Sequence, residues 1–480
     1  MATESIRKSF LYKAGESFGN QGIAFIVNII LARLIDPSDY GVLTLLTVFI
    51  AISRVFVNSG LNTALVQKEN IDEQEYHSAF YFSFALACLM YGLLYVFAPS
   101  IANFYQSPVL VPVLRVLALV LFPGSLTTIL QAKVARERKF QSLMHASLLA
   151  TLCSGIIGIG MALHGFAYWA LVAQQCSNQL FLALFLSLRL RFWPKAVFSM
   201  RKLLTLLHFG WKLLVSGIVD VVYENLRALV IGKRYTRADL GYYNRGRQFP
   251  ELVMSSINST LQSVLLPILS KVQNSQNEFV HFMQHSVRLG SFVVFPLMMG
   301  LAVTAKPLIA LLLGEKWLLA VPFLQLACVD FALFPLHTAN LQAINAKGRS
   351  DLFLKLELIK KIYGIAILLI SIWYFQSVFA IVAGASISSI LSFFVNASQS
   401  HTLLGYGIGK QCRDILPNLL LSIAMGLLCA LPLCLPLPNA AILALQIVVG
   451  VASYVLLAYL SKNPSFILLW NGLKRRKHEL

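Results

Sequence analysis

The sequence predicts an all-α polytopic membrane protein with about 14 transmembrane helices. Three observations predict this class: a very apolar composition, a series of apolar stretches long enough to cross a bilayer, and a surplus of basic residues in the segments between them. Together they exclude a soluble globular enzyme and an intrinsically disordered chain.

The composition is that of a protein buried in lipid. Of the 480 residues, 58% are hydrophobic and 12% are charged. Soluble domains contain about 45–50% apolar and about 25% charged residues, and so few charges could not cover a surface exposed to water. The seven cysteines lie mostly inside apolar stretches and form no C-x-x-C motif. We interpret them as small core residues, and we predict no metal site and no cofactor.

Apolar stretches of about 20 residues, the length that crosses a bilayer core as a helix, recur along the whole chain. The predicted spans lie near 12–34, 42–64, 76–98, 109–130, 142–163, 167–187, 209–231, 247–269, 283–304, 318–342, 357–375, 377–399, 416–435 and 440–460. The first segment has no compact apolar core followed by a cleavage site, so we predict a retained helix and not a signal peptide.

The basic surplus predicts the orientation of the chain. The net charge is +19, from 39 Lys and Arg against 20 Asp and Glu. No aromatic RNA-binding pattern or long basic tail accompanies it, so we predict no nucleic-acid partner. If the N-terminus is inside, the inner segments hold roughly three times as many Lys and Arg as the outer ones. Both termini are therefore predicted to be cytoplasmic.

The chain also contains an internal repeat. RLIDPSDYG at 33–41 resembles KRYTRADLG at 233–241, about 200 residues later, and TTILQAKVARER at 127–138 resembles TANLQAINAKGR at 338–349. Ordered matches of this kind indicate a duplication, and an even number of spans per copy makes the two copies parallel. The predicted organisation is a six-helix N-terminal lobe (1–190), a basic cytoplasmic linker (191–208), a six-helix C-terminal lobe (209–400), two extra transmembrane helices (401–460) and a basic cytoplasmic tail (461–480).

Charges within the predicted spans are the candidate functional residues. In the seventh span Lys212, Ser216, Asp220, Glu224 and Arg227 share one helical face. Three charges near the bilayer centre cost roughly 9 kcal/mol on insertion scales, which is more than the apolar neighbours return. Asp220 and Glu224 are one turn apart and repel, so either one is protonated or a cation lies between them.

Other spans carry similar polar stripes, and each has two interpretations. The members are Glu16 and Asn20 in the first span, Arg54 in the second, Arg115 in the fourth, Gln174, Gln175, Asn178 and Gln179 in the sixth, Arg288 in the ninth and Asp330 in the tenth. They can line a water-filled cavity, or they can form static ion pairs and interhelical hydrogen bonds. Contributions from several separate helices favour the cavity. Glu16 can equally pair locally with Lys13 near the interface.

Proline residues interrupt several spans, and soluble catalytic motifs are missing from the sequence. Pro123, Pro250, Pro267, Pro296, Pro322 and Pro335 predict kinks or breaks. The sequence contains no Walker loop, H-E-x-x-H or nucleophile elbow, and its short connections leave no room for a catalytic domain outside the membrane. We therefore predict that the protein is not an enzyme.

Four stretches carry a family resemblance: ARLIDPSDYGVL from Ala32, DLGYYNRGRQFPEL from Asp239, LLGEKW from Leu312 and AKGRSDL from Ala346. They resemble the polysaccharide-export branch, the O-antigen or lipid-linked oligosaccharide flippases, of the multidrug/oligosaccharidyl-lipid/polysaccharide exporter superfamily. Within this branch the sequence is most similar to colanic-acid-type exporters of Gram-negative bacteria. The resemblance covers about residues 5 to 460.

The resemblance implies a flippase that moves an undecaprenyl-pyrophosphate-linked repeat unit across the bacterial inner membrane by alternating access. It also implies a cationic central cavity and coupling to H+ or Na+, with a lipid-linked oligosaccharide, membrane lipids and polysaccharide-assembly proteins as partners. By their placement in the spans, the residues that fit the cavity are Arg54, Arg115, Lys212, Arg227 and Arg288. Those that fit ion coupling are Asp220, Glu224 and Asp330.

Other functions remain open at this point. A peptidoglycan lipid flippase or a drug antiporter belongs to the same superfamily, and the mildly basic balance of charges in the spans discriminates weakly against the antiporter. A membrane-embedded polysaccharide polymerase or ligase would need a sizeable outer loop with catalytic side chains. The largest outer connection, from Gly232 to Arg247, is short and basic, and an enzyme would not explain the repeat.

Overall fold

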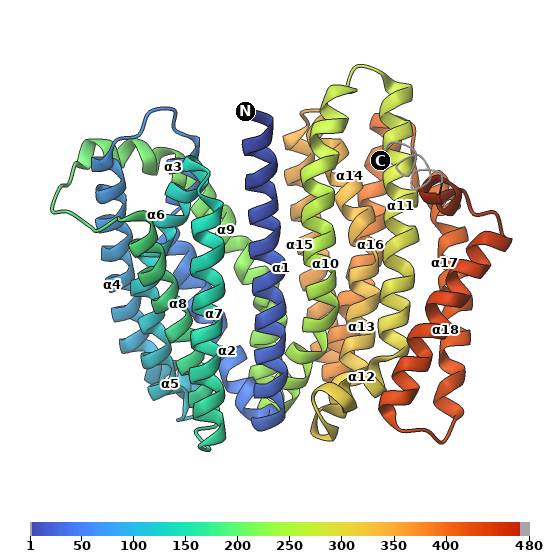
Figure 1. Cartoon of the computed structure of the whole chain (residues 1–480), viewed down its shortest axis with the longest axis horizontal. Helices are drawn as coiled ribbons and strands as arrows, with labels where there is room; N and C mark the ends of the chain where they lie inside the picture. The colour runs from blue at the N-terminus through green and yellow to red at the C-terminus, as the bar shows by residue number, and fades with distance from the viewer. Residues whose placement is uncertain (1, 471–480) are drawn as a thin grey trace. The chain divides into compact units, whose positions relative to one another are not determined.

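The computed structural model describes residues 2–470, and it describes side chains from residue 15 onward except at positions 17, 18 and 404. This part of the chain is helical and contains no strand (Figure 1). The elements are α1 (Ala2–Leu34), α2 (Pro37–Asn58), α3 (Leu61–Gln67), α4 (Glu73–Phe104), α5 (Leu110–Leu117), η1 (Ala118–Val120), α6 (Leu121–Glu137), α7 (Phe140–Leu163), α8 (Tyr168–Leu190), α9 (Met200–Arg234), α10 (Arg237–Lys271), α11 (Gln276–Val303), α12 (Ala305–Leu312), η2 (Glu315–Ala320), α13 (Val321–Ala332), α14 (Phe334–Ala346), α15 (Ser350–Ile370), η3 (Ser371–Phe375), α16 (Val378–Leu404), α17 (Ile408–Ala430), η4 (Leu431–Cys434) and α18 (Asn439–Leu460). An all-α polytopic membrane protein is therefore the correct fold class.

Twelve helical segments among the described residues are long and apolar enough to cross a membrane. Some of them combine consecutive shorter helices, as Pro37–Gln67 combines α2 and α3. Pro322 and Pro335 lie in the first turns of α13 and α14, where a missing N–H costs nothing. By contrast, α10 continues through Pro250 and Pro267. Each predicted span lies within a helical segment or extends beyond its end by a single residue, but α1 and α9 are not among the twelve, so the predicted count is not confirmed.

The helix α9 contacts α4, which is one of the twelve segments, near both of its ends. Near the start of α9, Lys202 pairs with Asp72 and donates a hydrogen bond to Gln74 Oε1 at 2.8 Å, where α4 begins. Near the end of α9, Lys233 donates to the backbone oxygen of Phe104, where α4 ends, and its Nζ lies 4.2 Å from the centroid of that ring. The two helices therefore run in the same direction.

The chain divides into two compact units, Met1–Gly241 and Tyr242–Leu480. In the first unit α1 packs against α7, α7 against α8, and α9 against α2, α3 and α4. In the second unit α11 packs against α17, α13 against α16, and α17 against α18. The helix α9 thus belongs to the first compact unit, although the predicted C-terminal lobe begins at residue 209. The predicted lobes describe a duplication in the sequence and stay a prediction.

One end of the first unit holds a buried apolar cluster that explains the position of the chain after α8. The cluster contains Leu61 and Leu65 of α3, Ile129 and Leu130 of α6, and further residues from α4, α7 and α8. Phe192, Leu203 and Leu206 are buried in the same cluster. Since these residues follow α8 and begin α9, the linker is held against the first unit and is not a free tether.

The starts of α2 and α10 cross at a pair of glycines that the repeat relates to each other. A Cβ atom on Gly41 would lie 1.8 Å from the backbone oxygen of Arg237, and one on Gly241 would lie 2.1 Å from that of Pro37. Both contacts lie within the first unit. Pro37 and Arg237 hold equivalent positions in the repeat, so the two contacts are reciprocal.

Candidate functional site

The first unit contains a polar pocket of about 730 Å³ between five of its helices, α1, α2, α7, α8 and α9. Its lining residues are Glu16, Asn20, Gln21, Ala24, Asn28, Thr47, Ile50, Ala51, Arg54, Thr151, Gln174, Gln175, Asn178, Gln179 and Asn225. The amide side chains of Asn and Gln are the largest group among them, and Glu16 and Arg54 are the charged residues. A wall of this kind presents both hydrogen-bond donors and acceptors.

Helical periodicity explains why these residues meet. On α1, Glu16, Asn20, Ala24 and Asn28 recur every fourth residue, and such residues lie on one face of a helix. The same rule places Thr47, Ile50, Ala51 and Arg54 together on α2 and Gln174, Gln175, Asn178 and Gln179 together on α8. The pocket is therefore the meeting point of polar stripes that separate helices carry.

Hydrogen bonds hold part of the pocket wall in place. Thr151 of α7 donates to Asn20 Oδ1 of α1. Asn178 Nδ2 donates to Ser154 Oγ at 3.1 Å, and Gln179 Nε2 donates to Thr127 Oγ1 at 2.6 Å, which ties α8 to α7 and α6. Because an amide side chain has two donor hydrogens and an acceptor oxygen with two lone pairs, these bonds do not exhaust its capacity. The wall is both ordered and able to bind further polar groups.

Arg54 is the cation of the pocket, and its side chain is exposed in it. A guanidinium is planar and offers donors in a fork that matches a carboxylate or phosphate in two parallel hydrogen bonds. Glu16 supplies the acidic side chain of the wall. Lys13, which the sequence places near Glu16, lies outside the residues whose side chains are described.

Five other predicted site residues belong to the first unit but do not line this pocket: Arg115 on α5 and four residues on α9. The Arg115 guanidinium lies 4.0 Å from the ring centroid of Tyr95, and its Nε donates to the Tyr95 backbone oxygen at 3.4 Å. The four residues on α9 are Lys212, Asp220, Glu224 and Arg227, of which the first three are exposed. Their predicted roles stay predictions.

The two predicted site residues of the second unit have partners on other helices. Arg288 Nη2 of α11 lies 2.5 Å from Asp414 Oδ1 of α17, and Tyr406 donates to the same carboxylate at 2.7 Å. Asp330 of α13 interacts electrostatically with Arg247 of α10. The sequence analysis missed Asp414 because it precedes the predicted apolar span 416–435.

Five polar lining residues of the pocket were also missed. They belong to no stripe that the sequence analysis selected, and they are Gln21, Asn28, Thr47, Thr151 and Asn225. The recurrence of polar side chains at every fourth position of α1 could have indicated Asn28. Asn225 directly follows Glu224, but nothing in the local sequence indicates that it turns toward α1 and α2.

The fold is similar to those of solved membrane proteins. The chain is similar to the lipid II flippase MurJ in an inward closed conformation, with a TM-score of 0.75, 14% identity, and coverage of 94% of this chain and 98% of that one. It is also similar to an inward-facing multidrug resistance MATE family transporter of the MOP superfamily, with a TM-score of 0.60, 13% identity, and coverage of 80% and 95%. Identities this low establish the fold alone.

A sequence-family model then places the chain among proteins of polysaccharide biosynthesis. Residues 30–322 match the family described as "Polysaccharide biosynthesis protein", and the chain belongs to this family. The chain is 26% identical to the succinoglycan biosynthesis transport protein ExoT of Rhizobium meliloti (strain 1021) over 65% of this chain and 63% of that protein. It is 23% identical to the lipopolysaccharide biosynthesis protein WzxC of Escherichia coli (strain K12) over 85% and 84%.

These comparisons agree with the predicted class, a multi-pass membrane transporter of polysaccharide biosynthesis and not an enzyme. They also agree with the resemblance to the polysaccharide-export branch of the superfamily. A third relative is the teichuronic acid biosynthesis protein TuaB of Bacillus subtilis (strain 168), which is 24% identical over 78% of both chains. The chain spans less than two thirds of ExoT but more of TuaB and WzxC.

Proposed function

We propose that this protein is a flippase that moves an undecaprenyl-pyrophosphate-linked polysaccharide repeat unit across the bacterial inner membrane by alternating access. The observation that carries the proposal is the amide-rich pocket around Arg54. A sugar chain presents hydroxyl groups that both donate and accept hydrogen bonds, and amide side chains match both. The pyrophosphate is an anion, for which a guanidinium is the best-suited side chain.

The relatives support a substrate of this class. ExoT is named for succinoglycan transport, TuaB for teichuronic acid biosynthesis and WzxC for lipopolysaccharide biosynthesis. The solved neighbour MurJ is named a lipid II flippase. A carrier of lipid-linked sugars accounts for these names better than a drug antiporter does. We propose that other proteins of polysaccharide assembly are its partners.

The driving force that we propose is coupling to H+ or Na+ without a bound cofactor. The candidate coupling residues are Asp220, Glu224 and Asp330, because carboxylates within membrane-crossing helices are costly and usually serve ion pathways. We also propose the inner membrane as the location, with both termini in the cytoplasm, since the basic surplus of the inner segments favours that orientation.

The substitution Arg54→Gln tests the flippase. It removes the charge of the pocket and keeps a polar side chain of similar length. We expect export of the surface polysaccharide to fall about 10- to 100-fold in a strain that carries only this variant, since one charge-assisted hydrogen bond contributes roughly 1.5–3 kcal/mol. Lipid-linked repeat units should accumulate on the cytoplasmic side. Export and the lipid-linked pool are measured by glycan analysis of surface and membrane extracts.

Two variants serve as controls for this experiment. Arg54→Lys keeps the charge and should retain part of the export. Arg138→Gln makes the same chemical change at an exposed residue just after α6, outside the pocket, and should export normally. Unchanged export by Arg54→Gln at equal protein level would sink the proposal. Normal export of shorter glycan chains would favour the polymerase instead.

A further inference from the structure

The end of α8, the segment after it and the first turn of α9 have an exposed surface that the transport proposal leaves unused. It combines four basic residues, Arg189, Arg191, Lys195 and Arg201, with two large apolar ones, Trp193 and Phe198. Trp193 is 55% exposed and Phe198 is 48% exposed. We call these six residues the linker surface. Large aromatic side chains so exposed are unusual in a loop that only water surrounds.

Contacts with α4 hold the linker surface at one end of the first unit. The buried ring of Phe192 stacks on His77 with ring centroids 5.0 Å apart. The backbone N–H of Lys195 donates to His77 Nδ1 at 3.3 Å, and that of Ser199 donates to Ser78 Oγ at 2.9 Å. The segment is therefore a fixed surface.

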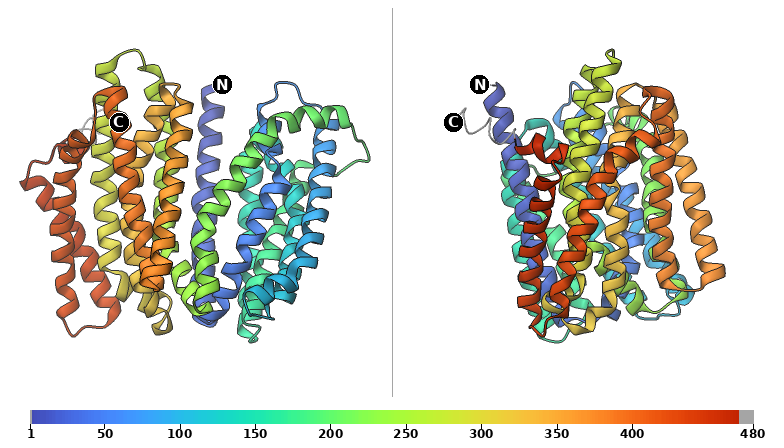
Figure 2. Two further views of the ribbon diagram at one scale, coloured as in Figure 1. Left: turned by 180° about the vertical axis from the view of Figure 1, so that it is seen from behind. Right: turned by 90° about the vertical axis from the view of Figure 1, so that its right-hand side faces the viewer.

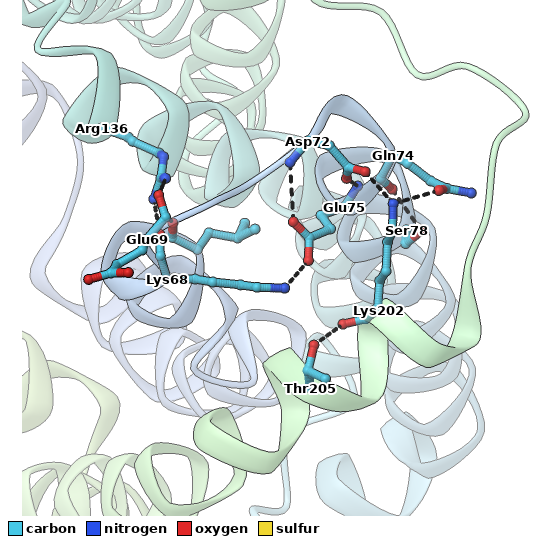
Figure 3. A network of polar contacts seen from close by, with 10 residues as sticks. Lys68, Glu69, Asp72, Gln74, Glu75, Ser78, Arg136, Lys202 and Thr205 are labelled. Carbon is cyan, nitrogen blue, oxygen red and sulfur yellow. Dashed lines mark hydrogen bonds and ion pairs between the residues drawn. The ribbon is translucent and has the colours of Figure 1, made fainter.

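The same contacts set the level of the linker surface relative to the membrane. Figure 3 shows Lys202 beside Asp72 and Gln74, at the beginning of α4, while Arg136 near the end of α6 lies in the same network. Both α4 and α6 belong to membrane-crossing segments that begin or end here. In Figure 2 the first part of α9 crosses this end of the first unit before the helix continues along it. The linker surface thus lies level with one end of these two membrane-crossing segments.

The chemistry of the surface fits lipid head groups at that level. Tryptophan and phenylalanine favour the boundary between head groups and acyl chains, and arginine and lysine bind the phosphates of anionic lipids. Exposed apolar side chains continue into α9 at Met200 and Leu204, next to the basic Arg201. A stretch in which exposed basic and exposed apolar side chains follow one another is typical of a segment that lies in the interface.

We propose that the linker surface is a binding site for the head groups of anionic phospholipids, with Trp193 and Phe198 inserted beneath the phosphates that the four basic residues bind. The surface would hold the connection between the two repeats in the plane of the membrane surface. The proposal does not depend on which substrate the protein transports, so it can fail or hold independently of the flippase.

Lipid titration of the purified full-length protein tests the proposal. Phosphatidylglycerol or phosphatidylcholine is added in detergent, and bound lipids are counted by native mass spectrometry. The test variant replaces Arg189, Arg191, Lys195 and Arg201 by Gln. We expect its affinity for phosphatidylglycerol to fall about tenfold or more, because each basic residue near a membrane surface contributes substantially to anionic-lipid binding, and its affinity for phosphatidylcholine to stay the same.

The matched control removes the same charge elsewhere. It replaces the exposed residues Lys271, Lys355, Lys410 and Arg413 of the second unit by Gln and should keep the affinity for phosphatidylglycerol. Equal losses in both variants would mean that only the net charge matters, and they would overturn the proposal. Farnesyl pyrophosphate is titrated in the same way as a third probe. The proposal would also be overturned if the test variant bound phosphatidylglycerol normally but lost its affinity for farnesyl pyrophosphate. That result would assign the surface to the head group of a lipid-linked substrate.

A depth measurement keeps the proposal testable if the charge variant does not fold. A fluorophore on Cys replacing Phe198, in a chain whose exposed native cysteines Cys88 and Cys434 are replaced, is read in nanodiscs that contain phosphatidylglycerol. We expect stronger quenching by lipids labelled at the head group than by a water-soluble quencher. Stronger quenching from the water phase would overturn the insertion of Phe198.

Discussion

The ion pair between Arg288 and Asp414 shows that the role of a charged residue in a membrane protein depends on where its partner lies. From the sequence Arg288 is a candidate cavity residue, whereas the structure gives it a carboxylate at 2.5 Å on another helix. The same carboxylate accepts a hydrogen bond from Tyr406, and Asn418 of α17 donates to the backbone oxygen of Arg288 at 3.0 Å. The Arg288 side chain therefore connects α11 to α17.

Removing one partner of this pair should destabilise the second unit. Asp414→Asn keeps the shape of the side chain but leaves the Arg288 guanidinium without its counter-charge. Because the Asp414 side chain is 9% exposed and that of Arg288 is 38% exposed, we expect a loss of about 1–3 kcal/mol in the free energy of unfolding, below the cost for a fully buried pair.

A double-mutant cycle measures the contribution of the pair. Arg288→Gln combined with Asp414→Asn removes both charges, and the double variant should lose less stability than the two single variants add up to. Thermal unfolding in detergent, followed by tryptophan fluorescence, gives the four values. Strictly additive losses would show that the two side chains do not stabilise each other.

The ion pair of Lys202 with Asp72 should give the linker a dependence on pH only in acid. The Lys202 ammonium, through a hydrogen bond to Asp72, lowers the pKa of that carboxyl below its ordinary value. A lowered pKa in the folded state stabilises the fold above the ordinary carboxyl pKa of about 3.9, and the stabilisation is lost as the pH falls below it. Stability should therefore be insensitive to this pair between about pH 5 and pH 8.

The variant Asp72→Asn separates this effect from general acid unfolding. It removes the acid-dependent part of the pair, so the difference in thermal midpoint between the natural protein and the variant should shrink as the pH falls below about 4. Lys202→Gln is the matched change on the other partner and should behave in the same way. A difference that stays constant from neutral to acid pH would show that Asp72 is not ionised in the fold.

At the scale of elements, the crossing of α2 and α10 gives the internal repeat a structural reason. The two aspartate–x–glycine sequences at 39–41 and 239–241 lie at helix starts whose backbones touch. Only glycine permits an approach in which a Cβ atom would stand 1.8 Å from a carbonyl oxygen. The repeated glycines are thus a requirement of packing.

Adding a methyl group at this crossing should be costly. Gly41→Ala or Gly241→Ala forces the starts of α2 and α10 apart, because the obstructing atom belongs to the backbone and cannot rotate away. We expect each variant to unfold at least several degrees lower in detergent. Gly160→Ala in α7 is the matched control, since no atom lies within 4 Å of the added Cβ, and there alanine should be neutral or stabilising by up to about 1 kcal/mol. Equal behaviour of the three variants would contradict the crossing.

Particular residues also show how far the sequence could predict the structure. Apolar length and helical periodicity placed each span on a helical segment to within one residue of its ends, and they selected Arg54, Asn178 and Gln179, which line the pocket. They could not supply Asn225 or Asp414, because the neighbour of a helix face depends on which helices pack together. Local sequence specifies the polar face of a helix, but only tertiary packing specifies its partner.

At the scale of the whole molecule, the number of crossings decides on which side each segment lies. If α9 crosses the membrane, the linker before it and the turn at Tyr235 after it face opposite sides, and six spans precede it. If it does not cross, both lie on one side and every later segment is inverted. The hydropathy of α9 does not place it among the twelve segments, but its contacts at both ends of α4 favour a crossing.

Cysteine accessibility in the full-length protein distinguishes the two arrangements. Lys195→Cys marks the linker and Arg234→Cys marks the end of α9, and both positions are exposed. We expect a membrane-impermeant maleimide to label Arg234→Cys in intact cells with a permeabilised outer membrane, and to label Lys195→Cys only after lysis. The reason is that α9 has the extent of a crossing helix and that the basic residues around Lys195 favour the cytoplasm. Labelling of both positions from the same side would show that α9 does not cross the membrane. The predicted orientation of every segment after α9 would then have to be reversed.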